Sequence, residues 1–317
     1  MKVLLTGING NLGHEVALDL DRRGFKIVPI IRTGKNVDLN TGKISFTKVI
    51  HNNLLSDEEL KFSGSADCIV HCAGNIHFRA AGDSNEKMTT KLVKLAKRLQ
   101  IPLYLISTAY IYRPPGVNQV SNNAYELDKF RSEQVLISSG IKYGIFRPSV
   151  LVGNSKSGEI QNFSGFYSIV KAFLKTLKGS KRKGKKLRFP NLPGKSNLVP
   201  VDQAAYYITN EVQNLRLRTL FITNPNPPQA SWVFKETLDF FSFTDTINLV
   251  ESTFEDFGKL DLSPEEQSLY EFIKYYYPYW SITYNFPPSI CKENLIDHDY
   301  LVKTLTFLNS SNYLKDG

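Results

Sequence analysis

Two reactive side chains four residues apart give the clearest chemical signal in this sequence of 317 residues. They are the phenol of Tyr125 and the ammonium of Lys129, within a helical pattern at 124–138. Residues four apart lie on one face of a helix, so the two groups point the same way. A nearby cation favours the phenolate and brings a tyrosine, whose usual pKa is about 10, towards the neutral range. The spacing therefore predicts an acid–base pair.

A hydroxyl group is expected at the same place. Thr108 follows an apolar run at 103–106, which has the pattern of a buried strand one strand–helix unit before Tyr125. Its side chain can donate or accept a hydrogen bond at the carbonyl oxygen that Tyr125 would protonate. We therefore predict that Thr108, Tyr125 and Lys129 are catalytic residues that act together on a carbonyl group.

The elements that position these groups have the pattern of a parallel sheet covered by helices. Short apolar runs alternate with amphipathic stretches; the runs lie at 2–5, 26–31, 68–71, 103–106 and 143–146. Near-continuous apolar strands that alternate with helices are typical of a sheet buried on both faces. We predict an α/β fold of the Rossmann type, a doubly wound parallel sheet that binds ligands at the carboxyl ends of its strands.

A glycine-rich turn after the first strand predicts a nucleotide site. In the run T-G-I-N-G-N-L-G at 6–13, Gly7 permits a tight turn, Gly10 lets backbone N–H groups approach a pyrophosphate, and Gly13 lets helix and strand pack closely. The N-terminus of the following helix adds partial positive charge. The residues of this turn that we expect to contact a dinucleotide are Gly7, Asn9, Gly10, Asn11, Leu12 and Gly13.

The residue after the second strand indicates which dinucleotide binds. NAD sites place an acidic residue there, about 20 residues past the glycines, to take the ribose 2′-hydroxyl. This sequence has Arg32, nineteen positions after Gly13. A guanidinium grips a 2′-phosphate with two charge-assisted hydrogen bonds. The sequence therefore favours NADPH over NADH.

Two further segments are expected to line the same pocket. Asn53 and Leu54 follow the third strand, where an amide and an apolar side chain could hold an adenine. Cys72, Ala73 and Gly74 follow the fourth strand, where small residues let the cofactor cross. These five residues are part of the predicted cofactor site on the sheet edge.

From about residue 150 onward the pattern loosens. We expect residues 1–150 together with about 197–225 to form the NADP-binding domain. About 151–196 and 226–317 are expected to form a smaller, mostly helical substrate-binding part.

Composition limits the other functions. The net charge is +9, and three scattered cysteines fit a reducing compartment better than a disulfide framework or a metal knuckle. His71 has no second ligand at metal spacing, so we predict a buried packing histidine and no metal site. No window approaches the roughly 20 apolar residues of a membrane span. We expect a cytoplasmic protein, as a monomer or a dimer.

The basic residues are concentrated in one run, from Lys178 to Arg188 (K-G-S-K-R-K-G-K-K-L-R). Such a run repels itself, so a solvated, mobile loop is the simplest expectation. The alternative is a docking surface for an acidic partner such as an acyl carrier protein. Nucleic acid is not expected, because no helix-turn-helix, RNA-binding or zinc motif accompanies the run.

The sequence resembles extended short-chain dehydrogenases over about residues 1–225. The shared motifs are T-G-I-N-G-N-L-G, H-C-A-G, Ser107-Thr108, Tyr125-x-x-x-Lys129 and Arg147-Pro148-Ser149. Within that superfamily it looks most like the thioester-reductase and male-sterility group, which includes fatty acyl reductases, through the segments at 71–78, 147–160 and 197–202. Three positions depart from the family pattern: Asn53 replaces the usual Asp, Gly74 an Ala, and Met88 a Gly.

The resemblance implies roles for the predicted residues. Tyr125 would be the acid, Lys129 would also hold the nicotinamide ribose, and Thr108 would orient the carbonyl. Pro148 would border the nicotinamide. The substrate contacts that we expect in addition are Ser107, His77 and Tyr112.

The favoured function is NADPH-dependent reduction of an acyl thioester, bound to a carrier or to coenzyme A, to an aldehyde or alcohol. Two alternatives stay open. One is an extended short-chain dehydrogenase or epimerase that acts on a free ketone, an alcohol or a nucleotide sugar, because fold and catalytic groups do not fix the substrate. The other is a non-catalytic NADP-binding protein.

Overall fold

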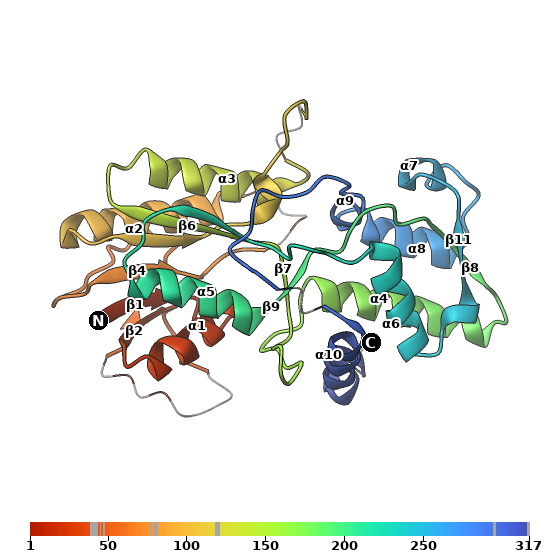
Figure 1. Ribbon diagram of the computed structural model, residues 1–317, viewed down its shortest axis with the longest axis horizontal. Helices are drawn as coiled ribbons and strands as arrows, with labels where there is room; N and C mark the ends of the chain where they lie inside the picture. The colour runs from red at the N-terminus through yellow and green to blue at the C-terminus, as the bar shows by residue number, and fades with distance from the viewer. Residues whose placement is uncertain are drawn as a thin grey trace. The chain divides into compact units, whose positions relative to one another are not determined.

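A seven-stranded parallel sheet combines six strands from the first half of the chain with one strand from residues 219–222 (Figure 1). The computed structural model describes residues 1–38, 44, 46, 48–76, 78, 82–117, 121–293 and 296–315. The strand order is β10-β6-β5-β4-β1-β2-β3, and every pair of neighbours runs parallel. The strands are β1 (Lys2–Thr6), β2 (Lys26–Ile31), β3 (Ile50–His51), β4 (Cys68–His71), β5 (Leu103–Ile106), β6 (Tyr143–Pro148) and β10 (Thr219–Ile222).

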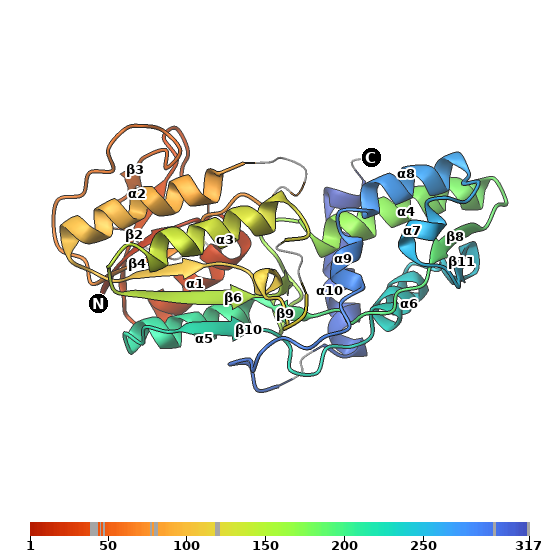
Figure 2. The same ribbon diagram turned by 90° about the horizontal axis from the view of Figure 1, so that it is seen from above.

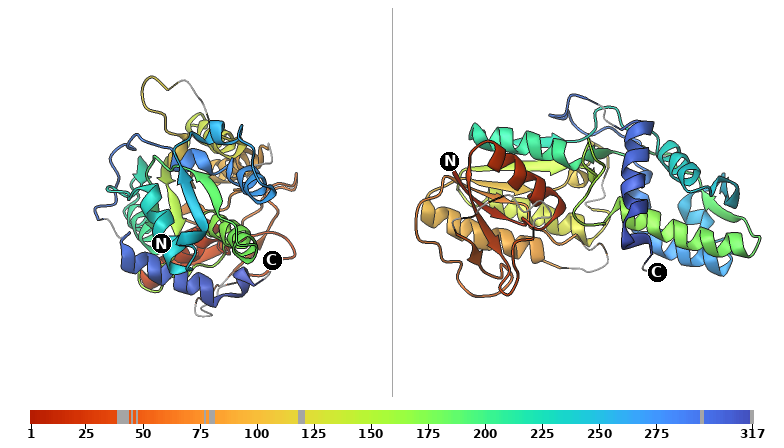
Figure 3. Two further views of the ribbon diagram at one scale, coloured as in Figure 1. Left: turned by 90° about the vertical axis from the view of Figure 1, so that its right-hand side faces the viewer. Right: turned by 90° about the horizontal axis from the view of Figure 1, so that it is seen from below.

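Helices cover both faces of this sheet because its strands are apolar on both sides. In β1, Val3 and Leu5 join one hydrophobic cluster and Leu4 joins the other. The first cluster lies under α1 (Asn11–Arg22) and α5 (Val201–Gln213), and the second under α2 (Ser84–Leu99) and α3 (Ala124–Ile137). Figures 2 and 3 show these two layers of helices on opposite faces. The predicted doubly wound Rossmann-type sheet is confirmed.

The chain divides into two compact units. Unit 1 comprises Met1–Leu151, Val199–Thr223 and Phe286–Lys292, and unit 2 the rest. The last segment of unit 1 was not expected from the sequence, which assigned all of 226–317 to the second part. Ser289 and Ile290 attach it to the end of β10: the Ile290 N–H donates to the Phe221 carbonyl (3.0 Å), and the Thr223 N–H donates to the Ser289 hydroxyl (2.9 Å).

Unit 2 is mostly helical and has an aromatic core. Phe173 and Phe189 pack edge to face, with ring centroids 4.9 Å apart, and Phe254 stacks on Tyr277 at 4.2 Å. Its longer elements are α4 (Phe166–Arg182), β8 (Leu187–Pro190), α6 (Ala230–Phe240), β11 (Ile247–Val250), α8 (Pro264–Ile273) and α10 (His298–Ser310). The short elements are η2 (Thr244–Thr246), α7 (Phe254–Phe257), α9 (Tyr277–Trp280) and η3 (Asn312–Leu314).

Two smaller sheets complete the fold. β11 pairs with β8 in parallel, and β7 (Val150–Val152) forms a two-stranded sheet with β9 (Leu198–Pro200). Among the described residues, no helix is long and apolar enough to cross a membrane.

The expectation of a mobile loop at 178–188 is wrong. The run begins in the last turns of α4, turns at Gly184, and enters β8. Its apolar residue Leu187 is buried where β8 pairs with β11, and Arg188 forms an ion pair of 2.8 Å with Glu266. The continuing helix and the paired strand leave only a short turn at 183–186 between them, so Lys178, Lys181, Arg182 and Arg188 are held in regular structure.

Candidate active site

The carboxyl end of β5 brings together the three predicted catalytic residues. Thr108 is extended after β5 and caps the short helix η1 (Ala109–Ile111), while Tyr125 and Lys129 lie on α3. A hydrogen bond joins the side chains of Tyr125 and Thr108. The Lys129 ammonium donates to the Ile106 carbonyl at 2.8 Å. The strand end and the helix therefore hold a phenol, a hydroxyl and an ammonium at one edge of the sheet.

The protonation of this group differs from the expectation. Burial raises the pKa of Tyr125 to about 12, and the carboxylates of Glu126 and Asp128 raise it further, while the hydrogen bond with Thr108 lowers it. Burial lowers the pKa of Lys129 to about 8, against the raising effect of Asp128. The pKa of Tyr125 therefore lies above its usual value instead of nearer to neutral pH, because burial and the neighbouring carboxylates raise it. At pH 7 the phenol keeps its proton and the lysine is mostly charged.

A buried carboxylate beside Lys129 ties α3 to the start of α2. Asp128 is 4% exposed and accepts hydrogen bonds from the backbone N–H groups of Asn85 (2.9 Å) and Glu86 (3.0 Å) and from the Asn85 amide (2.8 Å). Asn85 in turn bonds both the N–H and the carbonyl of Asn75. Asp128 thus takes the place of an N-cap for α2. This role of Asp128 was not predicted from the sequence. The only sign of it in the sequence is a polar residue at an inward-facing position of the helical pattern.

Two more carboxylates of α3 are fully buried and paired. Glu126 accepts from Arg113 at 2.7 Å, and Glu133 receives a bidentate pair of bonds from Arg147 at 3.0 and 2.6 Å. Arg113 also donates to the Tyr110 carbonyl at 2.5 Å. These pairs lock the segment after η1 and the strand β6 to α3, so Tyr125 and Lys129 stand on a helix fixed from several sides.

The glycine turn packs against the end of β4. Gly7 has φ +73°, and a Cβ there would lie 2.4 Å from the Ala73 nitrogen. A Cβ on Gly13 would lie 2.1 Å from the Gly7 carbonyl oxygen, so neither position accepts a side chain. The Thr6 hydroxyl accepts from the Ala73 N–H at 3.1 Å and lies 2.7 Å from Nδ1 of His71, which is buried as predicted. Gly7 and Gly13 therefore contribute only backbone to this turn.

Asn9 connects this turn to the loop after β2. Its amide donates to the Asn36 carbonyl (2.8 Å), and its oxygen accepts from the Asp38 N–H (3.0 Å). Arg32 is the first residue after β2 and is exposed. The Leu12 side chain packs in the core, so only its backbone belongs to the surface of the turn.

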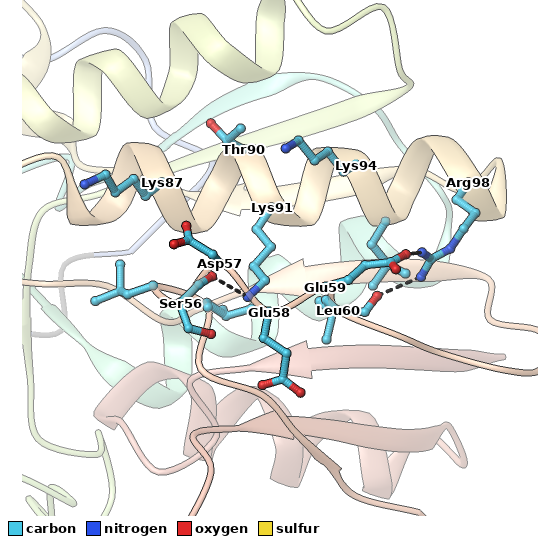
Figure 4. A pocket seen from close by; sticks show the side chains of 13 residues that line it. Ser56, Asp57, Glu58, Glu59, Leu60, Lys87, Thr90, Lys91, Lys94 and Arg98 are labelled. Atoms are coloured by element: carbon cyan, nitrogen blue, oxygen red, sulfur yellow. Dashed lines mark hydrogen bonds and ion pairs between the residues drawn. The ribbon is translucent and has the colours of Figure 1, made fainter.

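The segment after β3 is held to α2. The Asn53 side chain accepts from the Leu55 N–H at 3.1 Å, and Lys91 donates to the carbonyls of Asn53 (2.8 Å) and Ser56 (2.9 Å). Figure 4 shows Lys91 reaching from α2 towards Ser56, in a pocket of about 550 Å³ that Leu54 also lines. The Asn53 amide oxygen is therefore engaged within its own turn.

The small residues after β4 border the ammonium of Lys129. A Cβ on Gly74 would lie 3.1 Å from the Lys129 nitrogen and 3.2 Å from the Asn85 amide oxygen. Burial raises the pKa of the Cys72 thiol to about 12, so it stays neutral. Pro148 is buried at the end of β6. A side chain in place of Gly74 would therefore lie against the ends of the Lys129 and Asn85 side chains.

The predicted substrate residues differ in their surroundings. The buried Ser107 hydroxyl has no hydrogen-bond partner among the described residues, and neither has that of Ser149. Tyr112 packs edge to face against Phe221, with ring centroids 5.8 Å apart, and lies near Phe286. His77 lies outside the described residues.

These features fit a dinucleotide. The turn at 7–13 leaves no room for side chains at Gly7 and Gly13, and no side chain caps α1 at Gly10, so backbone N–H groups can approach phosphates. The hydroxyls of Ser107 and Ser149, at the ends of β5 and β6, offer buried polar atoms without a protein partner. Within the described part of the chain, no group of three or more metal-ligating side chains is arranged to hold a metal ion.

Comparison with solved structures finds the same fold in two kinds of protein. One is the terminal R domain from the myxalamid PKS-NRPS biosynthetic pathway (TM-score 0.73, 19% identity, 97% of this chain and 90% of that chain). A thiolation-reductase di-domain from an archaeal non-ribosomal peptide synthetase matches at TM-score 0.66 and 18% identity (99% and 76%). UDP-glucuronic acid 4-epimerase from Bacillus cereus, in complex with NAD, matches at 0.64 and 16% (100% and 99%).

A search of curated proteins found no matching sequence. Residues 3–183, more than half of the chain, match the family model described as NAD dependent epimerase/dehydratase family. That family belongs to the extended short-chain dehydrogenases, binds NAD(P) and consists mostly of enzymes. The chain is therefore a member of the NAD dependent epimerase/dehydratase family.

Proposed function

We propose that the chain is an NADPH-dependent reductase of acyl thioesters. The observation that carries this proposal is the protonated phenol of Tyr125, hydrogen-bonded to Thr108 and next to Lys129 at the carboxyl end of a parallel sheet. Ligands of such sheets bind at that edge. A neutral phenol and a hydroxyl fixed there are suited to meet an oxygen that becomes negatively charged.

The residues would divide the work as follows. A nicotinamide bound at this edge supplies a hydride, which with one proton converts a thioester to an aldehyde and a thiol. Tyr125, with a pKa of about 12, holds its proton at neutral pH and donates to the developing oxyanion. Thr108 adds a second hydrogen bond. Lys129 supplies a positive charge, anchored by the Ile106 carbonyl, beside the cofactor ribose.

Arg32 supports NADPH as the reductant. It is exposed directly after β2, where a guanidinium can reach a 2′-phosphate and where an NAD site has a carboxylate. Asn9 links this loop to the glycine turn through Asn36 and Asp38. The two contact regions for the adenosine half, the phosphate turn and the ribose end, are thereby held together.

The thioester is favoured over other carbonyl substrates by the likeness to two reductase domains of carrier-based synthetases. We propose unit 2 as the substrate-binding part, because the residues that could hold the cofactor all belong to unit 1. The product is an aldehyde, or an alcohol if a second hydride transfer follows.

A second candidate is action on a nucleotide sugar, a free ketone or an alcohol. The family description and the likeness to UDP-glucuronic acid 4-epimerase favour it. The same tyrosine, lysine and threonine would serve, because a site of this kind does not fix the substrate.

The test is NADPH oxidation by the purified chain with acyl thioesters, their matching aldehydes, ketones and nucleotide sugars, repeated with NADH. Tyr125→Phe should lower thioester turnover by about 10²- to 10⁴-fold, because it removes the proton donor. Tyr206→Phe, which removes the hydroxyl of an exposed tyrosine on α5, is the matched control and should stay within about twofold.

The substrates separate the candidates. Turnover of ketones or nucleotide sugars without thioesters would replace the proposal by the second candidate. NADPH binding without turnover of any substrate would point to a non-catalytic NADP-binding protein. Equal rates with NADH and NADPH would contradict the role of Arg32.

A further inference from the structure

The outer face of α4 carries a row of cations. Lys171, Lys175, Lys178 and Arg182 follow one another at helical spacing and line a hollow of about 260 Å³. The other described residues that line it are Leu174, Gly179 and Leu314, and none of the described lining residues is acidic. The opposite face of α4 is buried in unit 2 through Phe173, Leu177 and their neighbours.

The row differs from other basic residues in the same part of the chain. Lys183 pairs with Glu265, Arg188 with Glu266, and Lys181 lies over the Phe243 ring at 5.2 Å. By contrast, Lys175 and Lys178 are exposed, and neither they nor Arg182 has a hydrogen bond or an ion pair within the described residues. Lys171 donates to the Tyr313 carbonyl at 2.7 Å, so within the row it is the charge of Lys175, Lys178 and Arg182 that is available to another molecule. Lys183 and Arg188, by contrast, already have carboxylate partners.

The row does not stabilise the helix that carries it. Like charges four residues apart on a helix cost about 0.2–0.5 kcal/mol per pair. The helix dipole favours cations only in the last turn, which includes Arg182 but not Lys171 or Lys175. Its position is better explained by a partner than by the stability of α4.

The length of the row indicates the shape of that partner. Eleven residues separate Lys171 from Arg182, which at 1.5 Å per residue is about 16 Å. A single phosphate group is too small to reach both ends. An acidic helix with carboxylates at the same spacing can lie along the row and place an apolar side chain over Leu174 and Leu314. The backbone of a nucleic acid has no such apolar group to fill the hollow.

We propose that the face of α4 formed by Lys171, Lys175, Lys178 and Arg182 docks an acidic helix of a partner protein. The partner is the carrier protein that presents the acyl thioester, a part of the inference that rests on the proposed function. The sequence placed such docking on the whole run from Lys178 to Arg188. The surface proposed from the structure begins nearer the N-terminus, at Lys171, and is confined to one face of α4.

The test compares two substrates with the same reactive end. One is an octanoyl group on the phosphopantetheine arm of an acidic acyl carrier protein, and the other is octanoyl-pantetheine, which lacks the protein. The variant is Lys175→Glu with Lys178→Glu. The matched control is Lys185→Glu with Lys186→Glu, which makes the same change in charge at exposed positions of the adjacent turn.

The expected result is a loss of about 30-fold or more in kcat/KM for the carrier substrate in the first variant and of less than about threefold in the control. Octanoyl-pantetheine should be reduced by both variants within about twofold of the unmodified chain, which also shows that they fold. Equal losses in the two variants, or equal losses on the two substrates, would overturn the proposal.

Direct binding separates a failure of docking from a failure of the proposed function. Fluorescence anisotropy of the labelled holo carrier protein needs no turnover. Binding should weaken at least about tenfold in Lys175→Glu/Lys178→Glu and should fall as salt is raised. If no thioester is reduced but this binding pattern holds, the proposed function fails and the docking surface stands. If a double-stranded oligonucleotide binds the same face more tightly than the carrier does, the surface belongs to nucleic acid and the proposal is wrong.

Discussion

Helices α3 and α4 use charge in opposite ways. α3 buries Glu126, Asp128, Lys129 and Glu133, and each of these has a hydrogen-bond or ion-pair partner. α4 buries aromatic and aliphatic side chains and turns its cations outward. A buried charge without a partner costs several kcal/mol, so the charges of α3 depend on one another. Lys175, Lys178 and Arg182 of α4 are exposed to solvent, so they can be changed one by one.

The difference separates two tasks. The helix that carries Lys129 is fixed by ion pairs with other elements, as Arg113 and Arg147 hold the carboxylates of α3. Charged groups that attract a large partner protein need long, flexible side chains rather than a fixed position, and exposed lysines have such side chains.

The largest effect is expected where a buried pair of α3 is broken. Glu133→Ala leaves the Arg147 guanidinium without its bidentate partner, and we expect a loss of about 3–5 kcal/mol in the free energy of unfolding. Denaturant unfolding measures it. The control is Glu271→Ala, which breaks an exposed pair with Lys274 and should cost less than about 1 kcal/mol. Similar losses in both variants would remove the contrast between buried and exposed charge.

The next effect is on the pH dependence of activity. The pKa of Lys129 is lowered to about 8, so the lysine is charged below that pH and neutral above it. We expect kcat/KM to fall above pH 8 by about tenfold per unit, because this ratio reports the free enzyme. Asp128 raises the pKa of Lys129, so Asp128→Asn should move the decline to lower pH. A decline that stays in place, or moves upward, would contradict this.

The smallest effect is expected on α4. Lys175→Ala and Lys178→Ala each remove a like charge from the row, so the free energy of unfolding should stay unchanged or rise by up to about 0.5 kcal/mol. Thermal unfolding is sensitive enough to detect it. A loss of more than about 1 kcal/mol would mean that these cations have a structural role, in which case the contrast with α3 would fail.

The frame of unit 1 could be predicted from the sequence because its signals are local. The apolar runs at 26–31, 68–71 and 103–106 became β2, β4 and β5 with the same bounds. The helical pattern at 124–138 became α3 to within one residue at its end. Buried strands and amphipathic helices repeat their apolar residues at a fixed period, which neighbours in sequence are enough to reveal.

What could not be predicted depends on contacts between distant residues. Asp128 lies 43 residues from Asn85, and Ser289 lies 66 residues from Thr223. No local pattern indicates either partner. The high charge of the run from Lys178 to Arg188 predicts a loop. The run contains one large apolar residue, Leu187, and that residue is buried and pairs within the β8–β11 sheet. The raised pKa of Tyr125 likewise comes from burial, which spacing alone does not reveal.

The cap that Asp128 places on α2 links assembly of the catalytic group to folding. The residue next to the predicted catalytic lysine completes the first turn of a helix that begins some forty positions earlier in the chain. If the first turn of α2 unfolded, Asp128 would lose its hydrogen-bond donors and α3 would be held less firmly. If α3 moved, the first turn of α2 would lose its cap. Because of this coupling, we expect the two elements to open and close together as one cooperative unit.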